Sequence, residues 1–319
     1  MKYYQNTFDF QIQEPCALSL GKFDGLHTGH KALMREITAA QDRGLTSVAL
    51  TFAVPPDIPD GRGYHVLSTR REKELIFSRA GVDVLIEMPF DDRIRNMDPV
   101  SFLRFLKERM NVKLIVAGTD FRFGYRRSGD SRTLQQYADA FGYSCVIVDK
   151  LVCEGAEISS TRIRTCVIEG KIELANRLLG YPYLIMGEVI HGEGVGRKGG
   201  FPTVNLRPDE QKLLPPNGVY FSTAEVDGTR YPAITNIGKK PTAGHFPVGV
   251  ETYLLDFAGD LYGREVIIYL HCFRRPEQRF ESFDALREQI GRDLDACRAY
   301  FLENPTEKSV DKLCFTQYN

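Results

Sequence analysis

Two of the six histidines in this 319-residue chain, His27 and His30, lie three residues apart beside a glycine-punctuated turn, Gly21 to Gly29. A short apolar run, Ala17 to Leu20, precedes the turn, and an amphipathic helical pattern follows it. A strand, a glycine turn and a helix N-terminus in this order form a phosphate site, because free amides and the helix dipole favour an anion there. Imidazoles at such a site can donate to phosphate oxygens and stabilise charge at phosphorus. The spacing therefore favours a nucleotide-phosphate site.

Two other interpretations of this histidine pair stay open on the residues alone. The pair could mark a solvated helix start, or it could be half of a metal site. A zinc site would need further Cys or His at ligand spacing, and none is nearby in the sequence.

Two later segments also place polar and basic residues directly after expected strands. The stretch Gly118 to Arg132 combines two phenylalanines with four arginines, and Ile158 to Arg164 combines Ser-Ser-Thr with two arginines. A solvated basic turn and a helix N-cap are the simpler interpretations of the two. Both segments, however, follow strands of the same expected sheet, so they should lie at the edge that carries the histidine turn.

A second candidate phosphate site is the glycine-rich stretch from Gly192 to Asn205, which has five glycines in nine residues. Such a loop can turn backbone amides onto phosphate oxygens. Thr203 and Asn205 alternate onto one face of an extended segment and offer neutral oxygens that suit Mg²⁺. The pattern is not GxxxxGK[ST], so it does not predict a P-loop kinase.

The elements that carry the first site are predicted to form a doubly wound α/β domain with a parallel sheet. Continuous apolar runs typical of buried parallel strands alternate with helical stretches. The expected strands are Cys16–Leu20, Ser47–Phe52, Val82–Met88, Lys113–Ala117 and Ser144–Val148. The expected helices are His30–Arg43, Arg70–Ala80, Asp98–Met110 and Ser131–Phe141. Asp98-Pro99 is a typical helix start, and Gly44, Gly81 and Gly142 are typical helix ends.

Beyond a helix at Ile172–Leu179, the pattern changes near Tyr181 to strands separated by turns such as Asp227-Gly228. The expected strands are Leu184–Ile190, Val219–Val226, Pro232–Ile237, Val248–Phe257 and Val266–Phe273. An amphipathic helix follows over about Phe283 to Glu303. This pattern predicts a small antiparallel β-barrel with a C-terminal helix. We expect two domains, residues 1–182 and 183–319.

Composition narrows the possible classes of protein. A net charge of -1 argues against a general nucleic-acid binder, and no run is long and apolar enough to span a membrane. The N-terminus has no apolar core of a secretion signal, and the seven cysteines form no CxxC pair. We expect a cytoplasmic protein with reduced thiols, without an obligate protein partner.

Three motifs in the first half resemble those of a known family. GKFDGLHTGH, from Gly21 to His30, is similar to the FDGxHxGH signature of the flavin-adenylylating branch of the HxGH nucleotidyltransferases. GTDFRFG from Gly118 resembles the GxDFRFG motif of the flavin adenylyltransferases, and Ser159 to Arg164 resembles their SSTxIR motif. The resemblance implies transfer of AMP from ATP to the phosphate of FMN.

The same resemblance implies roles for individual residues of the first half. His27 and His30 would be catalytic and stabilise charge at phosphorus. The implied nucleotide-binding residues are Gly21, Phe23, Asp24, Gly29, Ser160, Thr161 and Arg164. The implied flavin-binding residues are Asp120, Phe121, Arg122 and Phe123, with the two rings flanking the flavin. The loop after Phe52 departs from the family's TFxPxP-like pattern, so we assign it no catalytic role.

The second half resembles the riboflavin kinases. The glycine-rich loop is similar to their GRxxGFPTxN motif, with Val204 in place of the usual Ala. The resemblance implies nucleotide binding by Gly194, Gly196, Arg197 and Gly200, and Mg²⁺ binding by Thr203 and Asn205. A lone carboxylate in a strand usually marks its solvent face, but Glu251 opens the segment ExxLLDFxxDLYG, which resembles the kinase segment that carries the general base. The family's usual His two residues later is Tyr253 here, which leaves the packing of that ring open.

The resemblance covers about residues 15 to 303, and on it the chain is identified as a member of the bacterial bifunctional riboflavin kinase/FMN adenylyltransferase family, the FAD synthetases. It implies ATP as co-substrate, Mg²⁺ as cofactor, and riboflavin, FMN and FAD as substrates and products. Two alternatives remain at this point: a single-activity enzyme with one degenerate site, and a flavin-binding regulator without turnover.

Overall fold

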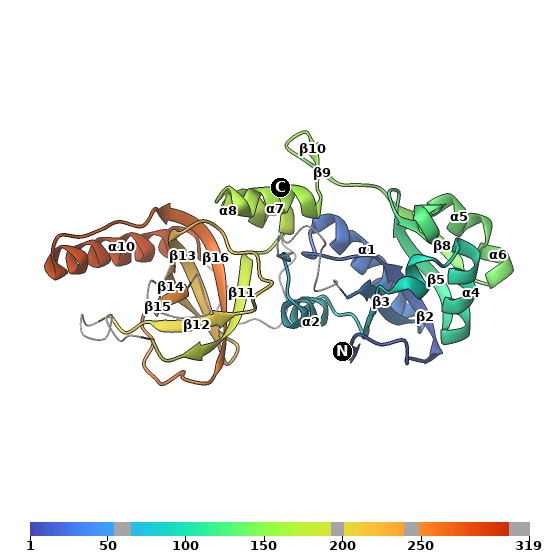
Figure 1. Ribbon diagram of the computed structural model, residues 1–319, viewed down its shortest axis with the longest axis horizontal. Helices are drawn as coiled ribbons and strands as arrows, with labels where there is room; N and C mark the ends of the chain where they lie inside the picture. The colour runs from blue at the N-terminus through green and yellow to red at the C-terminus, as the bar shows by residue number, and fades with distance from the viewer. Residues whose placement is uncertain (54–64, 193–200, 239–248, 306–319) are drawn as a thin grey trace. The chain divides into compact units, whose positions relative to one another are not determined.

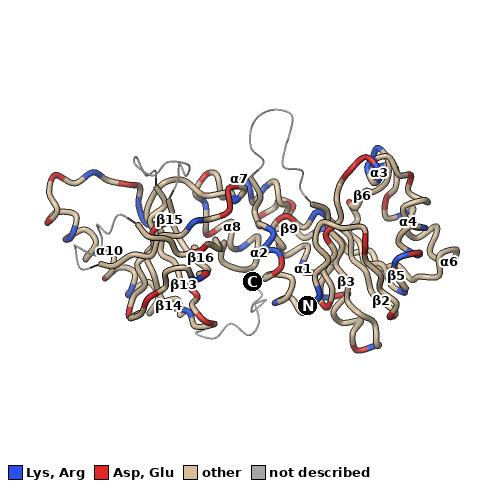
Figure 2. The backbone as a smooth tube through the Cα atoms, turned by 60° about the horizontal axis from the view of Figure 1, so that its bottom comes forward, with Lys and Arg blue, Asp and Glu red and all other residues tan. Residues whose placement is uncertain are grey.

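The computed structural model describes residues 1–53, 65–192, 201–238 and 249–305 (Figure 1). The chain divides into two compact units. The first contains Met1–Tyr64 and Lys73–Ser160, and the second contains His65–Glu72 and Thr161–Asn319. Basic and acidic residues are interspersed along the backbone (Figure 2).

The first unit is built on a six-stranded parallel sheet with the order β1-β4-β3-β2-β5-β8. Its strands are β1 (Lys2–Tyr4), β2 (Ile12–Leu20), β3 (Thr46–Phe52), β4 (Val84–Met88), β5 (Met110–Gly118) and β8 (Ser144–Val148). The five predicted strands are therefore confirmed. The sixth, β1, is too short to show a periodic pattern in the sequence.

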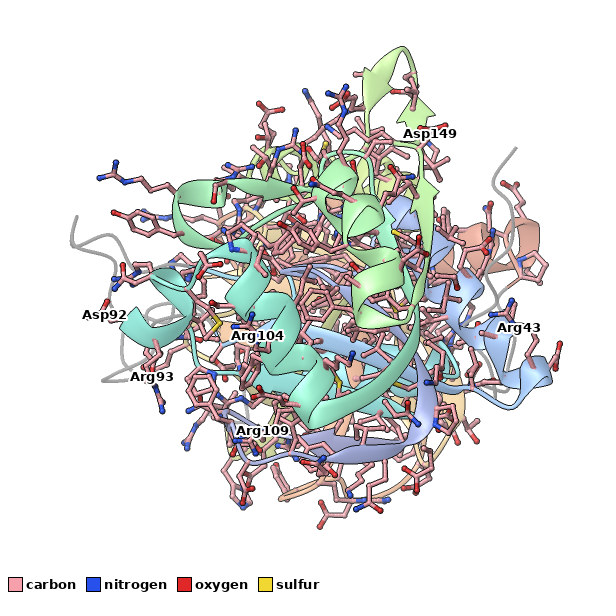
Figure 3. All side chains as sticks on the ribbon, turned by 90° about the vertical axis from the view of Figure 1, so that its right-hand side faces the viewer. Arg43, Asp92, Arg93, Arg104, Arg109 and Asp149 are labelled. Carbon is pink, nitrogen blue, oxygen red and sulfur yellow. The ribbon has the colours of Figure 1, made fainter. Side chains whose placement is uncertain are left out.

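Helices pack against this parallel sheet, which confirms the predicted α/β domain. They are α1 (Thr28–Ala39), η1 (Ala40–Arg43), α2 (Arg70–Arg79), α3 (Asp92–Arg95), α4 (Pro99–Arg109), α5 (Ser131–Gln136) and α6 (Ala138–Phe141). Asp98 caps α4 as predicted, since its Oδ1 accepts from the amides of Val100 and Ser101, each at 3.0 Å. The predicted helix at 131–141 is divided at Tyr137, where the backbone leaves helical geometry. Charged side chains such as Arg43, Asp92 and Arg93 project from the periphery of this unit (Figure 3).

Two short hairpins follow strands β5 and β8 of the sheet. After β5, the two-residue strands β6 (Arg122–Phe123) and β7 (Gly129–Asp130) pair around the 3-10 turn η2 (Tyr125–Arg127). After β8, a small hairpin pairs β9 (Val152–Cys153) with β10 (Ala156–Glu157).

The second unit is a closed six-stranded barrel with the order β11-β12-β15-β14-β13-β16. Its strands are β11 (Tyr183–Ile190), β12 (Val204–Pro208), β13 (Gly218–Val226), β14 (Thr229–Gly238), β15 (Gly249–Leu254) and β16 (Glu265–Arg275). The predicted barrel is confirmed, and β12 is a strand that the sequence pattern did not predict. The C-terminal helix α10 (Phe283–Glu303) has the expected bounds and lies along the barrel (Figure 1).

Helices α7 (Ser160–Ile168) and α8 (Ile172–Leu179) group with the barrel, apart from Ser160 itself. The Asn176 side chain explains part of this grouping. Its amide nitrogen donates to the carbonyls of Leu270 (2.9 Å) and His271 (3.2 Å), and its oxygen accepts from the Tyr183 amide at 2.7 Å. The compact units thus divide the chain earlier than the predicted domain boundary at 182/183.

A second addition to the barrel unit is the segment His65–Glu72, which we call the strap. Backbone bonds join it to the loop after β12: the Val66 amide donates to Gln211 at 2.7 Å, and the Leu213 amide donates to Val66 at 2.9 Å. Glu72 and Lys212 form an ion pair of 2.7 Å in which both side chains are at most 1% exposed. Nothing in the local sequence pattern marks this segment as part of the second unit.

Within the described ranges, none of the helices combines the length and the apolar character needed to cross a membrane.

Candidate active sites

The first candidate site is the turn that joins β2 to α1. Its backbone needs two left-handed residues, Gly25 (φ 67°) and Phe23 (φ 45°), and the second is an unfavourable conformation for an aromatic residue. Gly21 is required by close approach, since a Cβ there would lie 2.8 Å from the Phe23 ring. Strained backbone of this kind is common at ligand sites.

His27 and His30 are held together by this turn. His27 is the N-cap of α1, and its Nδ1 accepts from the His30 amide at 3.3 Å. The two imidazoles stack with centroids 3.6 Å apart, and the Phe23 ring meets His30 edge-on at 5.1 Å. The structure therefore brings the two histidines to the helix N-terminus, as the sequence predicts.

The hydrogen bonds assign different tautomers to the two rings. Nδ1 of His27 accepts a bond, so its neutral ring carries the proton on Nε2. Nδ1 of His30 lies 3.2 Å from the carbonyl oxygen of Gly25, which can only accept, so His30 donates from Nδ1. Burial lowers the pKa of His27 to about 2 and that of His30 to about 4, and the neighbouring His30 also lowers the pKa of His27. His27 thus offers a donor when neutral, whereas Nε2 of His30 donates only after protonation.

Other predicted residues surround the turn. Asp24 is buried, and its backbone carbonyl accepts from Ser160 Oγ at 2.7 Å, across 136 positions of sequence. The charge of Asp120 acts on His30 and raises its pKa against the effect of burial. This proximity follows from the parallel pairing of β2 with β5, which places their carboxyl ends side by side. Gly29 fits closely, since a Cβ there would lie 3.2 Å from the His27 ring.

The two predicted flavin-flanking rings have different environments. Phe123 is buried in the core of the first unit, whereas Phe121 packs against that core half-buried. Their rings stack on each other at 5.5 Å with an interplanar angle of 16°, so the space between them holds no further ring. Arg122 is exposed and donates to the Phe121 carbonyl at 2.8 Å. Only the outer face of Phe121 is therefore placed to meet a ligand.

Thr161 and Arg164 belong to the second unit, where the Arg164 guanidinium donates to the carbonyl of His65 in the strap. Their roles at the nucleotide stay predictions.

The second candidate site is a cavity of about 380 Å³ on the outer face of the barrel. Val250, Thr252 and Leu254 of β15 point inward and are buried, so Glu251 and Tyr253 point outward. Glu251 lines the cavity together with Thr203. Directly paired positions place Asn205, Glu251 and Asn236 in one row across β12, β15 and β14. The structure thus brings together Thr203, Asn205 and Glu251, which are the predicted kinase residues within the described ranges.

The opposite wall of the cavity comes from α10 and the segment before it, including Phe283, Leu286 and Ile290. The Arg275 guanidinium of β16 binds the buried Asp293 of α10, with nitrogen–oxygen distances of 2.8 and 2.9 Å. This pair ties the helix to the barrel.

Several cavity residues had no role in the sequence-based prediction. They are Arg275, Glu277, Gln278, Phe280, Arg287 and Asp293. They come from the end of β16, the following segment and α10. The only feature of the sequence that these residues share is that they follow the last predicted strand within a short stretch, and this feature alone does not indicate a cavity.

The remaining predicted nucleotide-binding residues, Gly194, Gly196, Arg197 and Gly200, lie outside the described residues, as does most of the loop after Phe52. Among the residues that the structure does describe, no three or more His, Cys, Asp or Glu side chains gather into a potential metal site.

A parallel sheet with an HxGH phosphate turn, followed by a closed barrel with a carboxylate in its outer cavity, defines a class of two-part nucleotide-using enzymes. The FAD synthetase family matches residues 9–162, and the riboflavin kinase family matches residues 179–301. The chain belongs to the family of bifunctional riboflavin kinase/FMN adenylyltransferases.

Curated relatives agree with this assignment. The bifunctional riboflavin kinase/FMN adenylyltransferase of Listeria monocytogenes is 35% identical over 89% of this chain and 92% of its own length. That of Escherichia coli K12 is 36% identical over 91% and 94%. A crystal structure described as a macrolide-efflux protein from Streptococcus pneumoniae superimposes with a TM-score of 0.82 at 31% identity, covering 93% of this chain and 98% of that one.

Proposed function

We propose that this chain converts riboflavin to FAD in two ATP-dependent steps. The barrel unit phosphorylates riboflavin to FMN, and the sheet unit transfers AMP from ATP to FMN with release of pyrophosphate. The observation that carries the proposal is the presence of both a carboxylate-lined barrel cavity and a stacked histidine pair at a helix N-terminus, in the order of the two matched families.

In the kinase step, Glu251 accepts the proton of the riboflavin 5′-hydroxyl as that oxygen attacks the γ-phosphorus of ATP and ADP leaves. Its carboxylate lines the cavity, within the polar row that also holds Asn236. Apolar side chains including Phe201 and Tyr253, which meet edge-on at 5.9 Å, line the same cavity and suit a flavin ring.

The residues fit Mg²⁺ beside the ATP phosphates. Thr203 and Asn205 carry hard neutral oxygens, and Asn205 stands directly opposite Glu251 in the strand pairing. When bound, Mg²⁺ supplies charge neutralisation at the phosphate oxygens.

In the adenylyl step, a phosphate oxygen of FMN attacks the α-phosphorus, and the bond to the β-phosphate oxygen breaks. His27 donates from Nε2 in its neutral form. His30 joins as a second donor when the polyphosphate raises its pKa by supplying negative charge. Ser160, which donates to the Asp24 carbonyl beside the histidines, holds the leaving phosphates, and Asp120 with Phe121 contacts the flavin.

We also propose a cytoplasmic location without an obligate partner protein. The six cysteines within the described ranges form no disulfide with one another, which suits a reducing compartment.

Incubation of the purified chain with riboflavin, ATP and Mg²⁺, followed by chromatography, should show FMN and then FAD.

Two reciprocal variants test which unit performs each step. His30→Ala should slow FAD formation about 100- to 1000-fold and leave FMN formation intact. Glu251→Gln should slow riboflavin phosphorylation about 100- to 10,000-fold, mainly in kcat, and still make FAD from added FMN. Glu188→Gln, an exposed carboxylate on β11, is the matched control and should leave both rates unchanged. Equal loss of both activities in either folded variant would contradict the assignment.

A further inference from the structure

Lys73 is a buried lysine of α2 to which neither the motifs nor the family matches assign a role. Its side chain is only 5% exposed, which is rare for lysine. Four residues later on the same helix, Phe77 packs its ring 5.6 Å from Phe23, whose ring in turn contacts His30. Positions four apart share one face of a helix, so Lys73 lies on the face of α2 that covers the histidine turn.

The charge of Lys73 acts on His30 and lowers its pKa, so the Lys73 side chain lies within electrostatic reach of the histidine pair. Four titratable groups surround His30: His27 stacks on it, Asp24 and Asp120 raise its pKa, and Lys73 lowers it. Both imidazoles are neutral near neutral pH because burial lowers their pKa. Of these groups, Lys73 is the one that is positively charged at neutral pH at its ordinary pKa.

A polyphosphate that enters this site needs positive charge, since two carboxylates already act there. We propose that Lys73 is a catalytic residue of adenylyl transfer, whose ammonium binds a phosphate oxygen of ATP next to His30 and stabilises the charge that develops at the α-phosphorus. This proposal rests on the adenylyl function proposed above. Lys73 donates hydrogen bonds and transfers no proton, so the step balances as FMN phosphate plus ATP giving FAD plus pyrophosphate.

The ammonium also acts on His30 before ATP binds. Burial, and after it repulsion from Lys73, lowers the pKa of His30. Removal of the Lys73 charge should raise the pKa of His30, so that His30 keeps its proton and donates from Nε2 up to a higher pH. The basic limb of the pH–rate profile should therefore move to higher pH.

The test compares Lys73→Met with Lys73→Arg in the full chain. Lys73→Met should lower kcat/KM for FMN adenylylation about 100-fold or more, weaken binding of an α,β-methylene ATP analogue, and move the basic limb of the pH–rate profile to higher pH. Lys73→Arg should recover at least about tenfold of the loss, since it restores the cation. Riboflavin phosphorylation should stay unchanged in both. Lys107→Met, which removes an exposed lysine of α4, is the matched control and should behave as wild type.

The outcomes separate this proposal from its alternatives. A lysine that only stabilises the fold predicts a lowered melting temperature, no rescue by arginine and an unmoved pH profile, and that result overturns the proposal. If Lys73→Met does not fold, Lys73→Gln takes its place, and near-normal adenylylation in that variant is equally decisive against it. If His30→Ala still makes FAD at the normal rate, the site itself is misassigned. An inactive His30→Ala beside a normal Lys73→Met rejects the role of Lys73 alone.

Discussion

Replacement of Lys212 by Met tests whether the strap is an integral part of the barrel unit. The Lys212 ammonium binds Glu72 at 2.7 Å and the Leu67 carbonyl at 2.7 Å, and it lies 4.1 Å from the centroid of the Tyr183 ring. The Glu72 carboxylate also accepts from the backbone amides of Thr69 at 2.9 Å and Met186 at 3.0 Å. Glu72, Lys212 and these four contacting residues all belong to the second unit.

The expected cost follows from this burial. Lys212→Met fills a similar volume but leaves the Glu72 carboxylate buried without its cation. Removal of one partner of a buried ion pair typically costs about 3–5 kcal/mol, whereas replacement of both by neutral groups is often close to neutral. We therefore expect Lys212→Met to destabilise the barrel unit by about 3–5 kcal/mol, and Glu72→Gln/Lys212→Met to recover most of that loss.

Thermal and urea unfolding, followed by circular dichroism and by residual riboflavin kinase activity, measure the effect. The matched control is Arg71→Met, which removes the neighbouring ion pair with Glu265, also 2.7 Å long but with the arginine 72% exposed. An exposed pair contributes about 0–1 kcal/mol, so this variant should unfold almost as wild type does. A Lys212→Met variant no less stable than Arg71→Met would refute the inference that the strap is anchored in the barrel core.

Two further predictions concern the sheet unit. The pKa of His30 is about 4 in the folded chain and about 6.5 in the unfolded chain, so the unfolded state binds more protons as pH falls between these values. The contribution of His30 to the free energy of unfolding should be fully present above about pH 6.5 and fall by up to about 2 kcal/mol near pH 5, and by less where solvent reaches the half-buried ring. Urea unfolding of His30→Gln should show a shallower decline of stability with falling pH, and an unchanged decline would contradict this prediction. Phe123→Ala should lower the free energy of unfolding by about 3–5 kcal/mol because its ring is in the core. Phe121→Ala should lower it by less but should raise KM for FMN. If melting and kinetic measurements rank the two variants the other way, the assignment of Phe123 to the core and of Phe121 to FMN binding is wrong.

Local chemistry made much of this protein readable from its sequence. The turn before α1 forms from neighbouring residues: Gly25 accepts the left-handed conformation, and His27 caps the helix that begins one residue later. The strand and helix patterns likewise depend on periodicities of two and 3.6 residues, so most element bounds agreed to within a few residues. Short or interrupted elements such as β12 carried too little periodic signal.

Contacts between distant segments were decided only by tertiary structure. The bond from Ser160 to Asp24 joins residues 136 apart, and the pair of Glu72 with Lys212 joins residues 140 apart. No local propensity encodes such a pair, since it exists only after the sheet order and barrel closure bring the segments together. The same holds for the two phenylalanines after β5, which look equivalent in the motif. Packing of the core buries Phe123 and leaves Phe121 partly exposed, because only the ring that points into the sheet unit can be enclosed by other side chains.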